Sequence, residues 1–113
     1  IHFLKTPIHT IGLGKIMSAG VLLLASGERG HRKIGKRARI MMHPISSGAY
    51  GTIFDQKNIV AEMERLQGQW QECMIDNTNF TKSQLETMMS SNVDTYLTPE
   101  QAIAHGIIDD ILA

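Results

Sequence analysis

The sequence predicts a single small domain of the mixed α/β class, in which strands and helices alternate along the chain. Short apolar stretches such as Arg39–His43 are typical of buried strands. Between them lie stretches with apolar residues at helical spacing, above all Ile59–Met74. A chain of 113 residues is long enough to bury a core in one domain without disulfide bonds.

Composition narrows the range of functions. Eleven basic and eleven acidic side chains cancel, so neither nucleic acid nor an anionic membrane is an expected partner. Cys73 is the sole cysteine, which excludes an internal disulfide and fits a reducing, cytoplasmic compartment. The longest apolar run, Val21–Ala25, is too short for a membrane span, and we expect no signal peptide at the start. No histidine pair has metal-ligand spacing beside cysteine or carboxylate, so no metal or cofactor is expected.

The first part of the chain predicts strand, helix and strand in turn. Glycines punctuate it and mark turns between the elements. Four elements are expected: a buried strand at Ile8–Leu13, a helix at Val21–Ser26 that is apolar on nearly all sides, a short strand at His31–Ile34 and a second buried strand at Arg39–His43.

The second part is predicted to be mainly helical. After a glycine-rich loop at Ser46–Gly51, Asp55 begins the longest helix, which ends near Asn77. Its apolar residues step by four, three, four and four positions, and they are Ile59, Met63, Leu66, Trp70 and Met74. Thr81 with Gln84 resembles a capping box for a helix to about Met89. Two further elements are expected: an extended piece at Tyr96–Leu97 and a helix that starts at Thr98–Pro99–Glu100 and ends at His105–Gly106, followed by a strand or tail.

One serine stands where a nucleophile is often found. The segment Gly14–Gly20 joins an apolar strand to an apolar helix, and Ser18 lies just before that helix. Glycines allow a tight turn there, and the free N–H groups of the helix start favour developing negative charge. Serine is also among the best helix N-caps, so capping is the alternative role for Ser18.

Two further residues are candidates for the same chemistry. His43 ends an apolar strand, and α/β folds present functional groups beyond strand ends. Asp94 lies in a turn rather than on a solvated helical face, although aspartate is also a common turn former. A serine needs a histidine to take its proton and a carboxylate to hold the imidazole ring, so Ser18, His43 and Asp94 form a possible triad.

Over nearly its whole length the chain resembles the proteolytic subunit of the caseinolytic Clp protease, a serine peptidase with a ClpP/crotonase-type fold. The matching motifs are Gly14–Gly20, the basic turn at 27–32, the strand Arg39–His43 and the C-terminal block Asp94–Asp109. The spacing between Ser18 and His43 is also that of the family.

The resemblance implies a ClpP-like layered fold and a serine endopeptidase that hydrolyses unfolded polypeptide. It assigns Ser18 as nucleophile, His43 as general base and Asp94 as orienting carboxylate, with the Ala19 N–H as an oxyanion donor and Gly20 allowing close packing. The implied partners are identical subunits in a ring and an ATP-driven unfoldase. The apolar face of 59–74 and the loop 46–51 are the expected contact surfaces.

The chain departs from the family pattern at several positions. Ile16 and Met17 replace small residues before the serine, Val93 and Thr95 replace arginines beside the aspartate, and Pro44 replaces a Gln-Pro pair. The family's N-terminal part, which supplies a second oxyanion donor, has no counterpart, so we expect residues 1–113 to form the C-terminal two-thirds of the family fold as one domain.

These departures leave other roles open. The main alternative is a non-catalytic, ClpP-like structural subunit or inactive fragment that pairs with active partners. A crotonase-type acyl-CoA enzyme would need an adenine-binding segment and paired acids, neither of which the sequence shows. A serine–lysine peptidase is disfavoured by His43, although Lys15 lies close to Ser18 in sequence.

Overall fold

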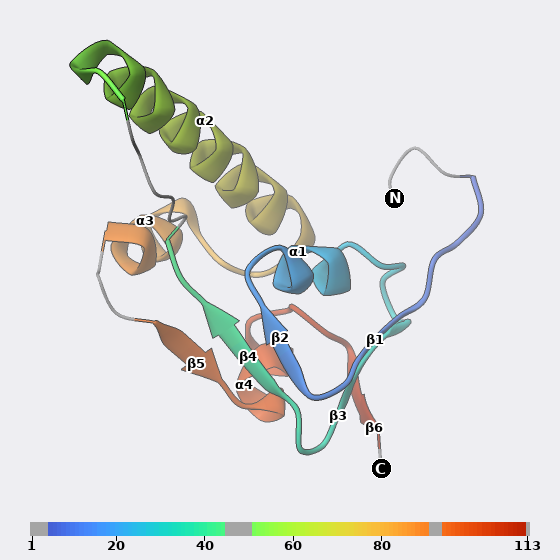
Figure 1. Cartoon of the computed structure of the whole chain (residues 1–113). Helices are drawn as coiled ribbons and strands as arrows, with labels where there is room; N and C mark the ends of the chain where they lie inside the picture. Colours follow the sequence, from blue (N-terminus) through green and yellow to red (C-terminus); the bar gives the residue numbers. More distant parts are fainter. Residues whose placement is uncertain (1–4, 45–50, 91–93, 113) are drawn as a thin grey trace.

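The computed structural model describes residues 5–44, 51–90 and 94–112, which form two small sheets surrounded by helices (Figure 1). The strands are β1 (Thr10–Gly12), β2 (Lys15–Met17), β3 (Arg32–Gly35), β4 (Arg39–Met42), β5 (Thr95–Leu97) and β6 (Asp110–Leu112). The helices are α1 (Ala19–Ala25), α2 (Ile53–Asn77), α3 (Lys82–Ser90) and α4 (Pro99–Ala104). Strands and helices alternate along the chain, which confirms the predicted mixed α/β class.

Each sheet has three strands. In the first, β3 lies between β1 and β6, and both pairings are parallel. In the second, β4 lies between β2 and β5; it runs parallel to β2 and antiparallel to β5, as the opposed arrows of β4 and β5 in Figure 1 show. The second sheet carries the three candidate residues of the triad at or next to its strand ends.

The chain passes from the first sheet to the second twice, between β1 and β2 and between β3 and β4. The first crossing turns at Gly14, whose φ of 74° lies in the left-handed region that favours glycine. The Arg39 N–H donates to the Gly14 carbonyl over 2.9 Å and so ties the start of β4 to this turn. This bond joins the chain at the amino ends of β2 and β4, the ends opposite to Ser18 and His43.

Strand β2 was not predicted, because the sequence analysis treats Gly14–Ser18 as a turn into the helix. Three residues are too few for an alternating pattern to stand out, yet the alternation is present: Ile16 is buried while Lys15 and Met17 are exposed. The consequence is that Ser18 follows a strand of the second sheet directly.

Two expectations about burial are wrong. The buried strand predicted at Ile8–Leu13 is a three-residue edge strand, and Ile11 and Leu13 are 59% and 70% exposed. The helix expected to be buried on nearly all sides is buried on one face, because Val21 and Leu24 lie in the core while Leu23 is exposed. Both exposed patches lie along β1 and α1.

Helix α2 is longer than expected. It begins at Ile53, two residues before the predicted start, where Thr52 and Asp55 form a reciprocal capping box. Its predicted apolar face is buried only near the end, since Met74 is fully buried while Leu66 is 43% exposed. The first turns extend away from the two sheets (Figure 1).

The two remaining helices confirm their predicted caps. Thr81 and Gln84 exchange hydrogen bonds at the start of α3, and Thr98 and Gln101 do so at the start of α4. The largest fully buried side chains come from both sheets, from α1, α2 and α3 and from the segment before β6, and they are Val21, Ile34, Ile40, Met42, Met74, Leu85, Ile107 and Ile108. Of the predicted loop Ser46–Gly51, residues 46–50 lie outside the described residues.

Candidate active site

Ser18 occupies a strained turn between β2 and α1. Its φ is 55° and its ψ is −119°, and within the described ranges no other residue except glycine has a positive φ. Such a conformation costs an L-residue about 1–3 kcal/mol, so the surrounding structure has to hold it in place. The backbone is held on both sides: the Ser18 N–H donates to the Met41 carbonyl over 3.2 Å, and the Ser18 carbonyl accepts from Val21 N–H over 3.1 Å.

The Ser18 side chain does not cap α1. Thr52 and Thr98 each accept a hydrogen bond from a backbone N–H of the helix that they precede, whereas Ser18 makes no such bond. The simpler role for this serine, helix capping, is therefore not the one it has in the structure. A strained serine on a strand-to-helix turn is the arrangement that exposes a nucleophilic hydroxyl in other hydrolases.

His43 follows β4, the strand next to β2. The parallel register places Met17 opposite Met41, so the carboxyl ends of β2 and β4, and with them Ser18 and His43, lie at one edge of the sheet. His43 is half-buried, and its Nδ1 lies 2.6 Å from the carbonyl oxygen of Pro44. A carbonyl can only accept, so Nδ1 carries a proton, and in the neutral imidazole Nε2 is then the acceptor nitrogen. That is the tautomer that a general base requires.

Asp94 precedes β5 on the other side of β4. The antiparallel register places Met42 opposite Thr95, so one step further along the strands His43 and Asp94 come to the same edge. The strand order β2, β4, β5 thus presents Ser18, His43 and Asp94 in that order. Asp94 is exposed, however, and no hydrogen bond joins these three residues in the described part of the chain. The acceptor for Nδ1 is instead the carbonyl of Pro44, a residue that the sequence analysis names only as a departure from the family pattern.

The residues around Ser18 fit the expectations only in part. Ala19 is the first residue of α1, and its N–H is one of the groups that a helix leaves without an intrahelical acceptor. The close packing expected at Gly20 is not found, because an added Cβ would meet nothing nearer than the Ile16 side chain at 3.4 Å. Ile16 points into the core rather than over Ser18, and Met17 is 43% exposed.

An open cavity of about 500 Å³ runs beside this turn. It is lined by residues of β1, β2 and α1, including Met17 and Gly20 on either side of Ser18. Several of its lining side chains are large and apolar and are exposed to solvent: Ile11, Leu13, Met17 and Leu23. The cavity therefore offers an apolar surface next to the candidate nucleophile.

The other possible bases are engaged elsewhere. The ammonium of Lys15 on β2 lies 5.8 Å from the centroid of the Tyr96 ring on β5. His9 stacks on His31 with ring centroids 4.0 Å apart, and His105 stacks on Phe80 at 4.4 Å. His43 is thus the histidine that shares a sheet edge with Ser18.

The described residues lack two features of other protein classes. Within 5–44, 51–90 and 94–112, no helix has both the length and the apolar character that a membrane span requires. The same ranges hold no group of three or more histidine, cysteine, aspartate or glutamate side chains able to hold a metal ion.

An α/β fold that brings a strained serine and a histidine to one sheet edge is an arrangement that nucleophilic hydrolases use. Comparison with known families agrees with this. The family model described as Clp protease matches residues 1–113, and the chain belongs to the Clp protease family. The mixed α/β fold is consistent with part of a ClpP-like fold, and membership in the family suggests that the protein assembles into oligomers.

Proposed function

We propose that this chain is a serine endopeptidase of the ATP-dependent Clp type. The observation that carries the proposal is the backbone of Ser18, which is held in a left-handed conformation between β2 and α1 without making a cap. Strain of this kind persists where function requires it, and here it coincides with the sheet edge that also bears His43.

The proposed reaction proceeds through an acyl-enzyme. Ser18 Oγ attacks the peptide carbonyl while His43 Nε2 takes its proton, and His43 then gives that proton to the leaving amine. Water, activated by the same imidazole, hydrolyses the ester on Ser18 and releases the second product. The Ala19 N–H stabilises the oxyanion of each tetrahedral intermediate.

Asp94 is proposed to orient the imidazole during this cycle. The carboxylate has to replace the Pro44 carbonyl as the acceptor for Nδ1–H, because the structure gives that proton to Pro44. The register makes this a short move. Met42 is paired with Thr95, His43 follows Met42 and Asp94 precedes Thr95, so His43 and Asp94 lie opposite each other. An ionised carboxylate is the stronger acceptor once His43 becomes positively charged.

The substrate and partners are proposed from the family. We expect unfolded polypeptide or short peptides as substrates, a ring of identical subunits, an ATP-driven unfoldase as partner, and a cytoplasmic location. Support for assembly comes from α2, where the large apolar side chains of Ile53, Phe54, Val60 and Leu66 are exposed.

An oxyanion hole ordinarily uses two donors, and loss of one lowers turnover about a hundred- to a thousandfold. By the resemblance described above, the second donor belongs to a part of the family fold without a counterpart in residues 1–113. We therefore propose that these residues by themselves turn over peptides slowly, and that a polypeptide carrying the family's N-terminal part restores the rate.

Labelling with a fluorophosphonate tests the proposal. The reagent forms a covalent bond to an activated serine, and peptide mass spectrometry locates it. Label on Ser18 that is lost in Ser18→Ala and in His43→Ala supports the peptidase. Assembled rings that stay unlabelled would instead support the alternative, a non-catalytic structural subunit, which the exposed Asp94 and the Pro44 contact also favour.

A further inference from the structure

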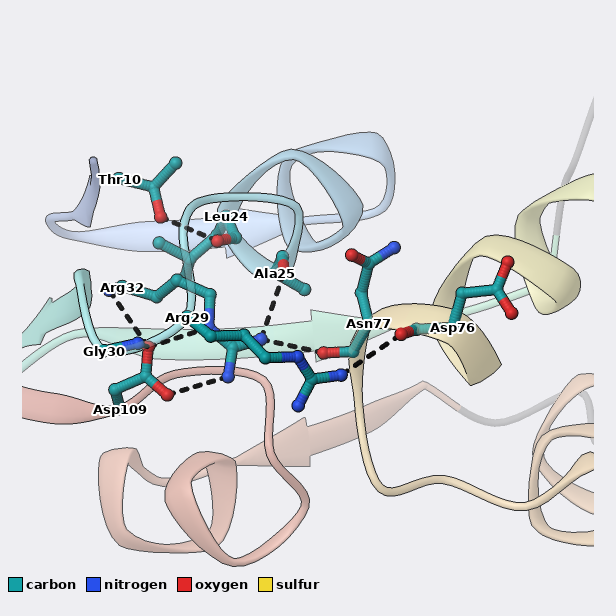
Figure 2. Close-up of polar contacts among 9 residues, drawn as sticks. All are labelled: Thr10, Leu24, Ala25, Arg29, Gly30, Arg32, Asp76, Asn77 and Asp109. Carbon is teal, nitrogen blue, oxygen red and sulfur yellow. Dashed lines mark hydrogen bonds and ion pairs between the residues drawn. The ribbon is translucent and has the colours of Figure 1, made fainter. Parts of the chain in front are cut away.

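The most extensive polar network of the structure lies at the other end of α1, around Arg32 of β3. Arg32 is 2% exposed, and its guanidinium reaches in two directions (Figure 2). On one side Nε and Nη2 donate to the two carboxylate oxygens of Asp109 over 2.9 and 2.8 Å. On the other, Nη1 donates to the carbonyl of Ala25 over 3.1 Å and to that of Asn77 over 2.7 Å.

The two carbonyls belong to the last residues of α1 and α2. Helix C-termini carry partial negative charge and unsatisfied carbonyls, so a guanidinium placed between two of them stabilises both. A planar fork of five N–H donors can serve a carboxylate and two carbonyls at once, which a lysine ammonium at the end of a flexible stem cannot do.

Asp109 fixes the guanidinium of Arg32 in place. Its carboxylate also accepts from the backbone N–H groups of Gly30 and Arg32, and its own N–H donates to the Arg32 carbonyl over 2.8 Å. These bonds fix the guanidinium of Arg32 to the segment that leads into β6. The guanidinium therefore stays in place if α1 shifts.

The remaining carbonyls in the last turn of α1 are also bound. The hydroxyl of Thr10 donates to the Leu24 carbonyl over 2.7 Å, and the hydroxyl of Ser26 donates to the Leu22 carbonyl over 2.6 Å. A helix of seven residues is too short to be stable alone, so its position depends on such anchors.

We propose that Arg32, fixed by Asp109, is a positioning residue that anchors α1 and thereby keeps Ser18 in its left-handed conformation. The inference rests on the proposed role of Ser18 as nucleophile. Ser18 is held from the strand side by its bond to Met41 and from the helix side by α1, which spans about 10 Å from Ala19 to Ala25. When the carboxyl end of α1 is released, the strained backbone of Ser18 can relax. This moves Ser18 Oγ away from the position that attack on a substrate carbonyl requires. A displacement of about 1 Å can lower a reaction rate about a hundredfold.

The test is Arg32→Lys in the full chain, with fluorophosphonate labelling followed over time. Lysine keeps the positive charge opposite Asp109 but loses the fork to Ala25 and Asn77. We expect the labelling rate constant at saturation, kinact, to fall about tenfold or more, while KI changes less than about twofold and every molecule is finally labelled. A purely structural role would instead lower the labelled fraction and leave kinact unchanged, and that result would overturn the proposal.

Two further variants control for stability. Leu85→Val shortens a buried side chain on α3 and should lower the melting temperature without changing kinact. Thr10→Val removes a different bond to the same end of α1, and we expect it to lower kinact in the same direction by less. Thr10→Val also keeps the proposal testable if Arg32→Lys does not fold. Equal losses of kinact in Leu85→Val and Arg32→Lys would contradict the proposal.

Hydrogen exchange separates this inference from the peptidase proposal. In Arg32→Lys the amides at 22–26 should exchange faster, while those of α4 stay as protected as in the wild type. If α1 exchanges faster in Arg32→Lys but the wild type is never labelled, Arg32 anchors α1 and the proposal that Ser18 is a nucleophile is refuted. A labelled wild type with unchanged α1 exchange in the variant would refute the anchor.

Discussion

The Nδ1 atom of His43 donates its proton to the carbonyl oxygen of Pro44, 2.6 Å away, and not to the carboxylate of Asp94. The bond fixes the imidazole in the tautomer that a general base needs, and it does so through the residue next in sequence. The contribution of Asp94 to the reaction then depends on whether its carboxylate takes over this proton in the active enzyme.

Asp94→Asn measures that contribution. If the carboxylate orients the imidazolium, we expect the variant to lower kcat by about four orders of magnitude, as loss of a triad aspartate does elsewhere, with little change in KM. Steady-state peptide hydrolysis by the assembled enzyme gives both constants. The matched control is Asp110→Asn, whose exposed carboxylate accepts from the Ile111 N–H. A loss below about tenfold in Asp94→Asn would show that the Pro44 carbonyl suffices.

Ser18→Gly should be more stable than the wild type while losing activity. Glycine adopts the φ of 55° without strain, and no cap is lost because Ser18 makes none. We expect the free energy of unfolding to rise by about 1 kcal/mol, measured by urea denaturation, and turnover to fall by several orders of magnitude. Ser26→Gly is the control and should be destabilised, because the Ser26 hydroxyl is bonded to the Leu22 carbonyl. A destabilised Ser18→Gly would contradict the assignment of strain.

Gly27→Ala should destabilise the protein. A Cβ at this position would lie 2.5 Å from the Thr10 hydroxyl oxygen and 3.2 Å from Cγ of Arg32. Because Thr10 Oγ1 is bonded to the end of α1, its displacement breaks that bond, and we expect a loss of about 1–3 kcal/mol by urea denaturation. Gly68→Ala on α2 makes the same chemical change with nothing within 4 Å, and should raise stability by about 0.5–1 kcal/mol.

Asp109 makes stability depend on pH in the acid range. The hydrogen bonds from the Arg32 guanidinium, together with those from the backbone N–H groups of Gly30 and Arg32, lower the pKa of Asp109 from 3.8 to about 2, although partial burial opposes this. A carboxyl whose folded-state pKa is depressed adds stability that is complete above its unfolded value. That contribution, about 2 kcal/mol here, is lost as the pH falls from about 4 to 2.

Urea unfolding at a series of pH values checks this. The free energy of unfolding of the wild type should fall over that interval by about 2 kcal/mol more than that of Asp109→Asn. Asp110→Asn, next to it and exposed, should follow the wild type. Parallel pH curves for the wild type and Asp109→Asn would rule out the linkage.

Self-association should depend on the exposed start of α2. Ile53 and Val60 line a shallow cavity of about 400 Å³ on this helix, and both are at least half exposed. We expect Val60→Glu to shift the protein toward smaller species in sedimentation velocity. Asn58→Asp adds the same charge on the opposite side of the helix and should assemble normally. Trp70 is a poor probe of assembly because it already packs against the core of its own chain, whereas Phe54→Trp would report it.

The sequence predicted those elements whose signals are local. The capping box of Thr81 with Gln84 and the helix start at Thr98 depend on residues within one turn, and both are present. The bond of the Gln101 side chain back to Thr98 was not predicted. Ser18, His43 and Asp94 were singled out from the sequence, but their order along one sheet edge was not, because β2 was not predicted and strand pairing depends on residues far apart in the chain. The strain at Ser18 was not predicted either, since the backbone dihedrals depend on how β2 and α1 are held by their neighbours.

Features that depend on distant residues could not be read from the pattern. Arg32 lies in a short polar stretch that looks like a solvated strand, yet it is buried, and its partner Asp109 is 77 residues away. The exposure of Leu23 on an apolar helix likewise depends on which elements pack against that helix, and these come from distant parts of the chain.

The separation between Arg32 and Asp109 also sets the order in which the protein can be completed during synthesis. A nascent chain that has emerged only through α3 already contains β3, α1 and α2, but its arginine has no carboxylate to neutralise it. Burying an unpaired charge is strongly unfavourable, so the core around α1 cannot close at that stage. Contacts of such long range also delay folding. Until Asp109 leaves the ribosome, the apolar faces of α1 and β3 remain open to chaperones and to aggregation.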